Sequence, residues 1–107
     1  MTNDSISALA RALLSPTPAQ VWTKAHYQGP ENERQGFRKD DAGNWIHRDH
    51  YGKRDSDYGW EIDHIYPSSL GGHDGLSNVR PLHWRANCAK SDTRPGLLGL
   101  TDYLAKR

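Results

Sequence analysis

Residues 60–92, WEIDHIYPSSLGGHDGLSNVRPLHWRANCAKSD, decide the fold of this chain. An adjacent acid and histidine, Asp63-His64, close a run with strand character, and the Gly71-Gly72 pair marks a loop beyond it. A short apolar and basic run and a helix-forming segment follow. The pattern predicts a strand over 58–66, a loop over 68–77, a second strand over 79–82 and a helix from about His83 to Lys90.

Three side chains in this stretch suit metal-assisted hydrolysis. Asp63 is a hard oxygen donor of the kind that a magnesium-like cation prefers, and Asn87 can add a neutral carbonyl oxygen. His64 has the side chain best suited to taking a proton near neutral pH. An acid ligand beside a general base predicts a metal that orients a phosphate and a base that activates water.

Further polar residues could support such a site. Asn78 could hydrogen-bond the backbone or the imidazole and so fix the orientation of the ring. Three cationic side chains are candidates for contacts with flanking phosphates, with a solvated surface role as the alternative for the arginines: Arg80, Arg85 and Lys90.

This segment resembles the HNH endonuclease family, whose fold is a ββα-metal (His-Me) finger. The resembling motifs are Asp63-His64-Ile65-x-Pro67, Gly71-Gly72, Asn78-Val79-Arg80-Pro81-Leu82 and Asn87-x-x-Lys90-Ser91-Asp92. The resemblance implies Asp63 as a metal ligand, His64 as the general base and Asn87 as the second metal ligand. It implies that Asn78 braces the active site and acts with His64 as a catalytic residue.

The chain also departs from the family's pattern. Many members have histidine at the Asn87 position, and asparagine there is similar to the HNH domain of RNA-guided CRISPR nucleases. Many members hold a structural zinc with two C-x-x-C pairs, but the second pair reads His83 and Ala86 here, so we expect no such zinc. Ser91 replaces a further histidine of colicin-type members. Mg²⁺ is therefore the expected cation, with Mn²⁺ or another transition metal as the alternatives.

The whole chain predicts a small α+β domain. Its 107 residues and mean hydropathy of −0.92 allow only a modest core. We expect an N-terminal helical segment over 1–27 and a nuclease domain over 28–107 with its finger core at 58–92, in one compact unit. Outside the finger we expect helices over 4–15, from Pro18 to about His26 and over 100–106, a loop over 28–36, and a β-hairpin of 37–39 and 45–47.

Composition also bears on partners and location. The net charge of +1 is low for a non-specific DNA binder, so DNA binding by this domain alone should be weak and salt-sensitive. The single cysteine, Cys88, forms no internal disulfide and is interpreted as a small buried helix residue. The chain has no apolar run long enough for a membrane span and no secretory signal pattern at its start, so we expect a cytoplasmic protein without membrane contact.

Several residues also have plainer interpretations. Asn78 could cap a turn, and Asn87 could face solvent. His83 is interpreted as a structural histidine, with a phosphate contact or a direct catalytic role as alternatives. An H-x-x-H of His47 and His50 could bind zinc only with a further ligand. All four tryptophans are interpreted as core residues, with stacking on DNA as the alternative for Trp22 and Trp45: Trp22, Trp45, Trp60 and Trp84.

One geometric difficulty remains inside the motif. Strict alternation along a strand places Asp63 and His64 on opposite faces, although both should approach one metal-bound water. We therefore expect the strand to twist or break at Asp63-His64.

The sequence thus predicts a metal-dependent DNA endonuclease acting on double-stranded DNA. The alternatives are a finger that binds DNA or a partner without cutting, a toxin domain guarded by an immunity protein, and an accessory nuclease of a phage or defence system that needs a protein partner for target choice.

Overall fold

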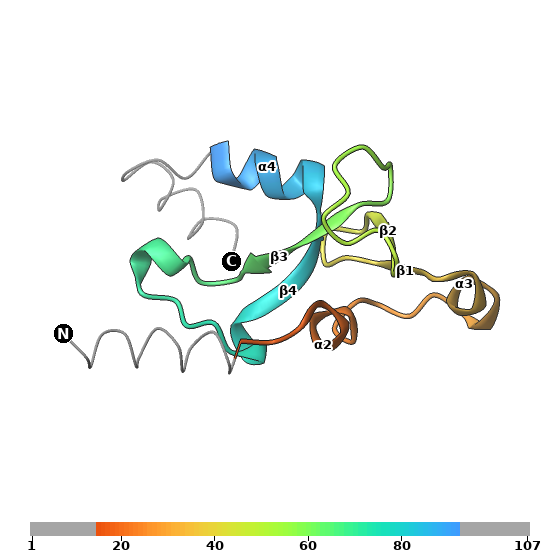
Figure 1. Cartoon of the computed structure of the whole chain (residues 1–107), viewed down its shortest axis with the longest axis horizontal. Coiled ribbons are helices and arrows are strands. Elements are labelled where there is room, and N and C mark those ends of the chain that lie inside the picture. Colours follow the sequence, from red (N-terminus) through yellow and green to blue (C-terminus); the bar gives the residue numbers. More distant parts are fainter. Residues whose placement is uncertain (1–14, 93–107) are drawn as a thin grey trace.

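The computed structural model describes residues 15–92. The helices expected over 4–15 and 100–106 therefore lie outside the described residues, apart from residue 15. Two antiparallel β-hairpins with short helices around them confirm the α+β class (Figure 1). In chain order the elements are α2 (Pro18–Trp22), α3 (Pro30–Gln35), β1 (Phe37–Lys39), β2 (Trp45–His47), β3 (Trp60–His64), η1 (Ser68–Leu70), η2 (Leu76–Asn78), β4 (Val79–His83) and α4 (Trp84–Asp92).

The short helix α2 begins as the sequence predicts and ends earlier. The Thr17 hydroxyl accepts a hydrogen bond from the Gln20 backbone, and the Gln20 side chain accepts one from the Thr17 backbone, which completes a capping box before Pro18. The predicted end near His26 is wrong. The helix stops at Trp22, and the backbone of His26 instead pairs with Lys39 beside the first hairpin.

The predicted loop over 28–36 is also wrong, because it contains α3. Pro30 occupies the start of this helix after Gly29, and Gly36 ends it in the left-handed region with φ of 93°. The acidic residues Glu31 and Glu33 lie in the first turn, where the helix dipole favours negative charge. The glycines and the proline that suggested a loop are thus the boundaries of a helix.

The first hairpin, β1–β2, is confirmed at its predicted residues. Phe37 pairs with His47 and Lys39 with Trp45, which leaves residues 40–44 as the turn. Asp40 organises that turn from a buried position, with only 2 % of the residue exposed. Its carboxylate accepts hydrogen bonds from three groups of the turn, the backbone amides of Ala42 and Asn44 and the side-chain amide of Asn44.

The second hairpin and the helix after it form the predicted finger. β3 and β4 are antiparallel, with Asp63 opposite Arg80 and His64 opposite Val79. Of the twist or break expected at Asp63-His64, the break does not occur, because the pairing continues through both residues and β3 ends after His64. α4 follows β4 directly and begins one residue later than predicted.

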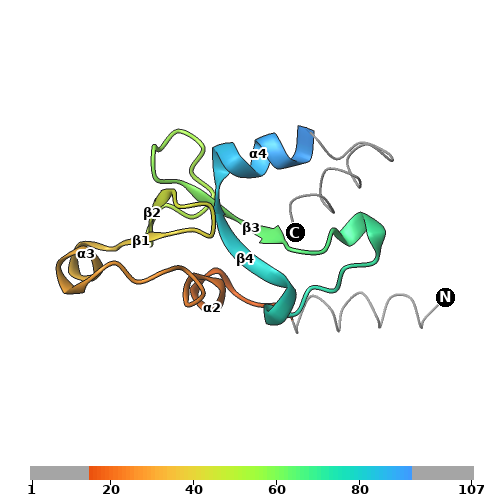
Figure 2. The same cartoon turned by 180° about the vertical axis from the view of Figure 1, so that it is seen from behind.

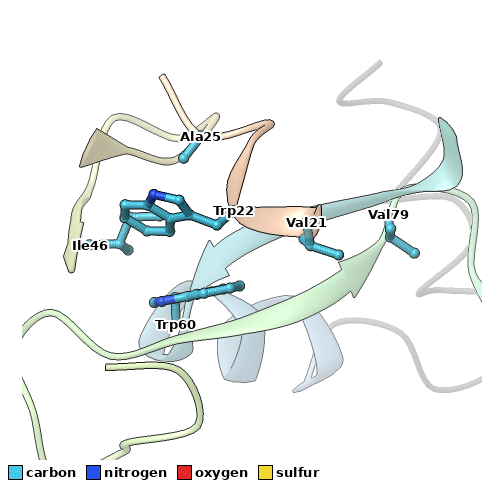
Figure 3. Packing of buried hydrophobic residues seen from close by; sticks show 6 residues of the cluster. All are labelled: Val21, Trp22, Ala25, Ile46, Trp60 and Val79. Carbon is cyan, nitrogen blue, oxygen red and sulfur yellow. The ribbon is translucent and has the colours of Figure 1, made fainter. Parts of the chain in front are cut away.

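α4 and α2 cover opposite faces of the β3–β4 hairpin, as Figure 1 and its reverse view in Figure 2 show. Side chains alternate along β3, so Glu61 and Asp63 face α4 whereas Trp60 faces α2. The rings of Trp60 and Trp22 lie 5.4 Å apart. The core on the α2 side consists of Val21, Trp22, Ala25, Ile46, Trp60 and Val79 (Figure 3).

Two packing predictions are corrected by the structure. Trp45 is 38 % exposed, and its ring lies under the Lys39 ammonium group at 4.8 Å instead of in the core. Cys88 is only partly buried. Trp84 is partly buried and donates its indole hydrogen to the Ser56 carbonyl at 2.7 Å.

Among residues 15–92, none of the helices combines the length and apolar character that crossing a membrane requires.

A buried carboxylate joins the two hairpins, and its removal should destabilise the fold. Besides the turn of the first hairpin, Asp40 accepts a hydrogen bond from the His83 backbone at 2.9 Å, where β4 meets α4. Asp40→Ala leaves these buried donors unsatisfied, so we expect the free energy of unfolding in urea to fall by about 3 kcal/mol. The exposed Asp49→Ala should change it by less than about 0.5 kcal/mol. Equal losses in the two variants would contradict this role.

Candidate active site

The Asp63 carboxylate lies between the finger hairpin and α4 and is almost fully buried, with 3 % of the residue exposed. The Arg80 guanidinium donates to it from β4, with Nε 2.9 Å from Oδ2. The Lys90 ammonium group lies 3.0 and 2.8 Å from its two oxygens and also donates to the His64 carbonyl at 2.9 Å. A buried carboxylate requires such cationic partners, so this is a position that attracts positive charge.

The three predicted phosphate-binding cations have different surroundings. Lys90 and Arg80 both contact Asp63, and Arg80 also donates to Asp41 at 3.2 Å. Burial alone would lower the pKa of Arg80, but the Asp63 and Asp41 carboxylates outweigh burial and raise it above its usual range. Arg85 lies on the exposed side of α4, 4.7 Å above the Trp84 ring, and donates to Asp57.

Asn87 lies on α4 one helical turn before Lys90 and contacts Glu61, two residues before Asp63 on β3. The Asn87 side chain donates its hydrogen bond to Glu61 Oε1 at 2.8 Å, and within the described residues it makes none to Asp63. Arg54 holds Glu61 through both carboxylate oxygens, at 2.5 and 2.9 Å. The hydrogen bond from Arg54 lowers the pKa of Glu61 below its usual value, and that from Asn87 acts in the same direction.

His64 ends β3 on the face opposite to Asp63, as strand alternation requires. Its Nε2 atom lies 2.8 Å from Asp74 Oδ1, in the loop after η1. A carboxylate accepts hydrogen bonds, so this contact places the imidazole proton on Nε2 and makes Nδ1 the basic nitrogen. Asp74 also lines a hollow of about 400 Å³ bordered by the glycine-rich loop.

Asn78 braces the loop between the strands through three hydrogen bonds to backbone atoms. Its side-chain oxygen accepts from the Tyr66 amide at 2.9 Å, and its amide group donates to the carbonyls of Tyr66 and His73. The buried Asn78 thus closes the loop on itself, while the imidazole of His64 is held by Asp74. A direct catalytic role for Asn78 stays a prediction.

His83 lies where a structural histidine is expected. It is buried at the junction of β4 and α4, with Nε2 2.7 Å from the Asp57 carbonyl and Nδ1 accepting from the Arg85 amide. Both ring nitrogens therefore bind the backbone. This arrangement supports the structural interpretation over a catalytic one.

The oxygen donors at the β3–α4 interface fit a hard divalent cation. Asp63 supplies a carboxylate at a position that already attracts cations, and Asn87 supplies an amide oxygen in the next turn of α4. No group of three or more His, Cys, Asp or Glu side chains that could hold a metal occurs within residues 15–92. Among the described residues, the oxygen donors that we assign to a cation here are one carboxylate and one amide.

Sequence reasoning missed two residues that the structure places at this site. Glu61 lies two residues before Asp63, and residues at that spacing in a strand share a face, so this signal was present. Asp74 lies in the glycine-rich loop, ten residues after His64 in the chain, and only the folded loop brings the two together. Loop conformation of this kind cannot be read from a local pattern.

Hairpin, loop and helix together define a ββα finger of the nuclease type, with an acid and a histidine at the end of its first strand. Comparison with known families agrees, since the model of the HNH endonuclease family matches residues 45–93. The finger thus lies within a segment of the chain, residues 45–93, that is similar to HNH endonucleases. No curated protein and no solved structure gives a significant match to it.

The glycine pair in the loop offers a matched test of how tightly the loop is folded. A Cβ atom at Gly72 would lie 1.9 Å from the Tyr66 carbonyl oxygen, whereas one at Gly71 would meet no atom within 4 Å. Gly71 has a φ of 97°, so Gly71→Ala should cost about 1 kcal/mol in urea unfolding. Gly72→Ala should cost more and increase hydrogen exchange of the Tyr66 amide, because the loop has to move away from Asn78. Equal behaviour of the two variants would contradict this packing.

Proposed function

We propose that the chain is a metal-dependent endonuclease that hydrolyses phosphodiester bonds in DNA. The observation that carries the proposal is the combination of a buried Asp63 carboxylate at the β3–α4 interface with a carboxylate-held histidine at the next position. One provides an oxygen ligand and the other a base, and both lie within the segment that is similar to HNH endonucleases.

His64 acts as the general base in this proposal. The Asp74 carboxylate accepts a hydrogen bond from the protonated Nε2 of His64, and this contact fixes the tautomer and the ring orientation. Nδ1 then takes the proton of the attacking water. Asp74 also stabilises the imidazolium that forms. The histidine is partly exposed, with 27 % of its side chain accessible, so water and substrate can approach it.

Asp63 and Asn87 would hold the divalent cation, with Mg²⁺ as our choice. When bound, such a cation withdraws charge from the scissile phosphate and the leaving 3′-oxygen. The chain's own cations, Arg80 and Lys90, lie against the Asp63 carboxylate and add positive field for a polyanionic substrate. Arg85, exposed and stacked on Trp84, is available for a flanking phosphate. The expected products carry 5′-phosphate and 3′-hydroxyl ends.

One observation favours a second candidate, a finger that binds DNA without cutting it. Arg80 and Lys90 already compensate the Asp63 charge, and a cation that joins them has to displace at least part of this contact. In that case DNA binding would be retained and turnover absent.

Cleavage of supercoiled plasmid tests the proposed reaction directly. With Mg²⁺ or Mn²⁺, His64→Ala should cut about 10²- to 10⁴-fold more slowly than the unaltered protein, because a general base is lost. Asp63→Ala and chelation by EDTA should each abolish cutting. Equal cutting by His64→Ala would defeat the assignment of the base, and DNA binding without cutting by the unaltered protein would establish the second candidate.

The Asp74–His64 contact gives a separate kinetic prediction. Asp74→Asn can present its amide nitrogen to His64 and so favour the wrong tautomer; we expect kcat to fall by at least about tenfold with little change in KM. Asp55→Asn changes an exposed carboxylate outside the site, so it serves as the matched control and should leave kcat unchanged. An unaltered kcat in Asp74→Asn would exclude this role for the carboxylate.

A further inference from the structure

We propose that Glu61 is a positioning residue that turns the Asn87 side chain so that its oxygen, and not its nitrogen, is presented to a hard divalent cation. This inference rests on the proposed function, since it concerns the second ligand of the same metal site. It gives Glu61 a role that the acid–histidine motif does not include.

The first argument is the chemistry of the contact. Asn87 Nδ2 lies 2.8 Å from Glu61 Oε1, and a carboxylate oxygen can only accept a hydrogen bond. The two ends of a primary amide have nearly the same shape, so steric packing hardly distinguishes its two orientations. Only the oxygen end is a ligand for Mg²⁺ or Mn²⁺. Glu61 therefore selects the orientation in which Oδ1 lies at the end of the amide away from the carboxylate.

The second argument is that Glu61 is itself held in place by three hydrogen bonds. Its Oε2 accepts from Arg54 Nε, and its Oε1 accepts from both Arg54 and Asn87. The Arg54 guanidinium also balances the negative charge. Such a carboxylate is suited to orient an amide, while its engaged oxygens make it a poor direct ligand.

The third argument is position in the fold. Glu61 and Asp63 are alternate residues on the face of β3 that lies against α4, and Asn87 and Lys90 are one turn apart on α4. The Glu61–Asn87 contact and the Asp63–Lys90 contact are therefore successive contacts between β3 and α4. The amide that Glu61 orients is thus one helical turn from Lys90, which contacts the carboxylate that is proposed to share the cation.

Direct measurement of Mn²⁺ binding tests the inference without any need for cleavage. The full chain is titrated with Mn²⁺ in the absence of DNA, and free Mn²⁺ is followed by electron paramagnetic resonance. Glu61→Gln, which preserves shape but lets the Asn87 amide turn over, should raise the Kd for Mn²⁺ about tenfold. Glu33→Gln is the matched control, because Glu33 is held by Arg38 in the same two-oxygen manner at a remote place, and it should leave the Kd unchanged.

A second background separates orientation from direct ligation. In Asn87→Asp both ends of the side chain are oxygens, so no orienting partner is needed, and Glu61 now repels its neighbour. Adding Glu61→Gln to Asn87→Asp should therefore leave Mn²⁺ binding unchanged or tighter. If Glu61→Gln weakens binding by the same factor in both backgrounds, Glu61 is a metal ligand and the inference is overturned. It is equally overturned if Glu61→Gln alone leaves the Kd unchanged.

Further variants keep the outcome interpretable. Arg54→Gln leaves Glu61 in place but releases it, and should weaken Mn²⁺ binding by a smaller factor than Glu61→Gln. Should Glu61→Gln fail to fold, as judged by circular dichroism, a Kd for Arg54→Gln equal to that of the unaltered chain would overturn the inference. Asp63→Ala should abolish Mn²⁺ binding. If Asp63→Ala binds Mn²⁺ as the unaltered chain does, the proposed metal site itself is wrong. If Asp63→Ala loses Mn²⁺ binding and Glu61→Gln keeps the Kd of the unaltered chain, only the role of Glu61 is rejected.

Discussion

The structure depends on one buried carboxylate, Asp63, and on the cations Arg80 and Lys90 that contact it. Asp63 has almost no solvent contact, and charge in such a place is tolerated only with close partners of opposite sign. Arg80 reaches it from the paired strand and Lys90 from the helix, so a single side chain joins all three elements of the finger. The same demand for positive charge makes the position attractive to a metal ion. Structural integrity and proposed chemistry thus arise from one electrostatic requirement.

Much of the fold could be predicted because its boundaries are marked by local signals. Thr17 and Pro18 indicate a helix start, and the glycine-containing turn at 40–44 lies between the two strand segments 37–39 and 45–47. The same kinds of signal were misinterpreted at α3, where Pro30 and Gly36 bound a helix instead of filling a loop. Trp45 was placed in the core because aromatic residues usually bury much area, yet its neighbour Lys39 covers it at the surface.

The candidate site could be predicted only as a set of residues. The motif identified the acid, the histidine and the two asparagines, but their contacts depend on which face of a strand or turn of a helix each occupies. The pairing of Asn87 with Glu61 follows from how α4 packs on β3, and that of His64 with Asp74 from the path of a glycine-rich loop. These are tertiary relations between separate segments. Local patterns contain no information on the offset between a strand and the helix packed on it.

The contacts of Asp40 bear on whether the finger could fold without the residues that precede it. The family match begins at Trp45, so the carboxylate that receives the His83 amide comes from outside the matched segment. Trp22, which packs against Trp60, likewise comes from upstream. If residues 45–93 were moved to another scaffold, Trp60 would lose its contact with Trp22, and the His83 backbone amide at the start of α4 would lose its acceptor. In this protein the HNH-like segment therefore depends on packing and hydrogen bonds from residues that precede it in the chain.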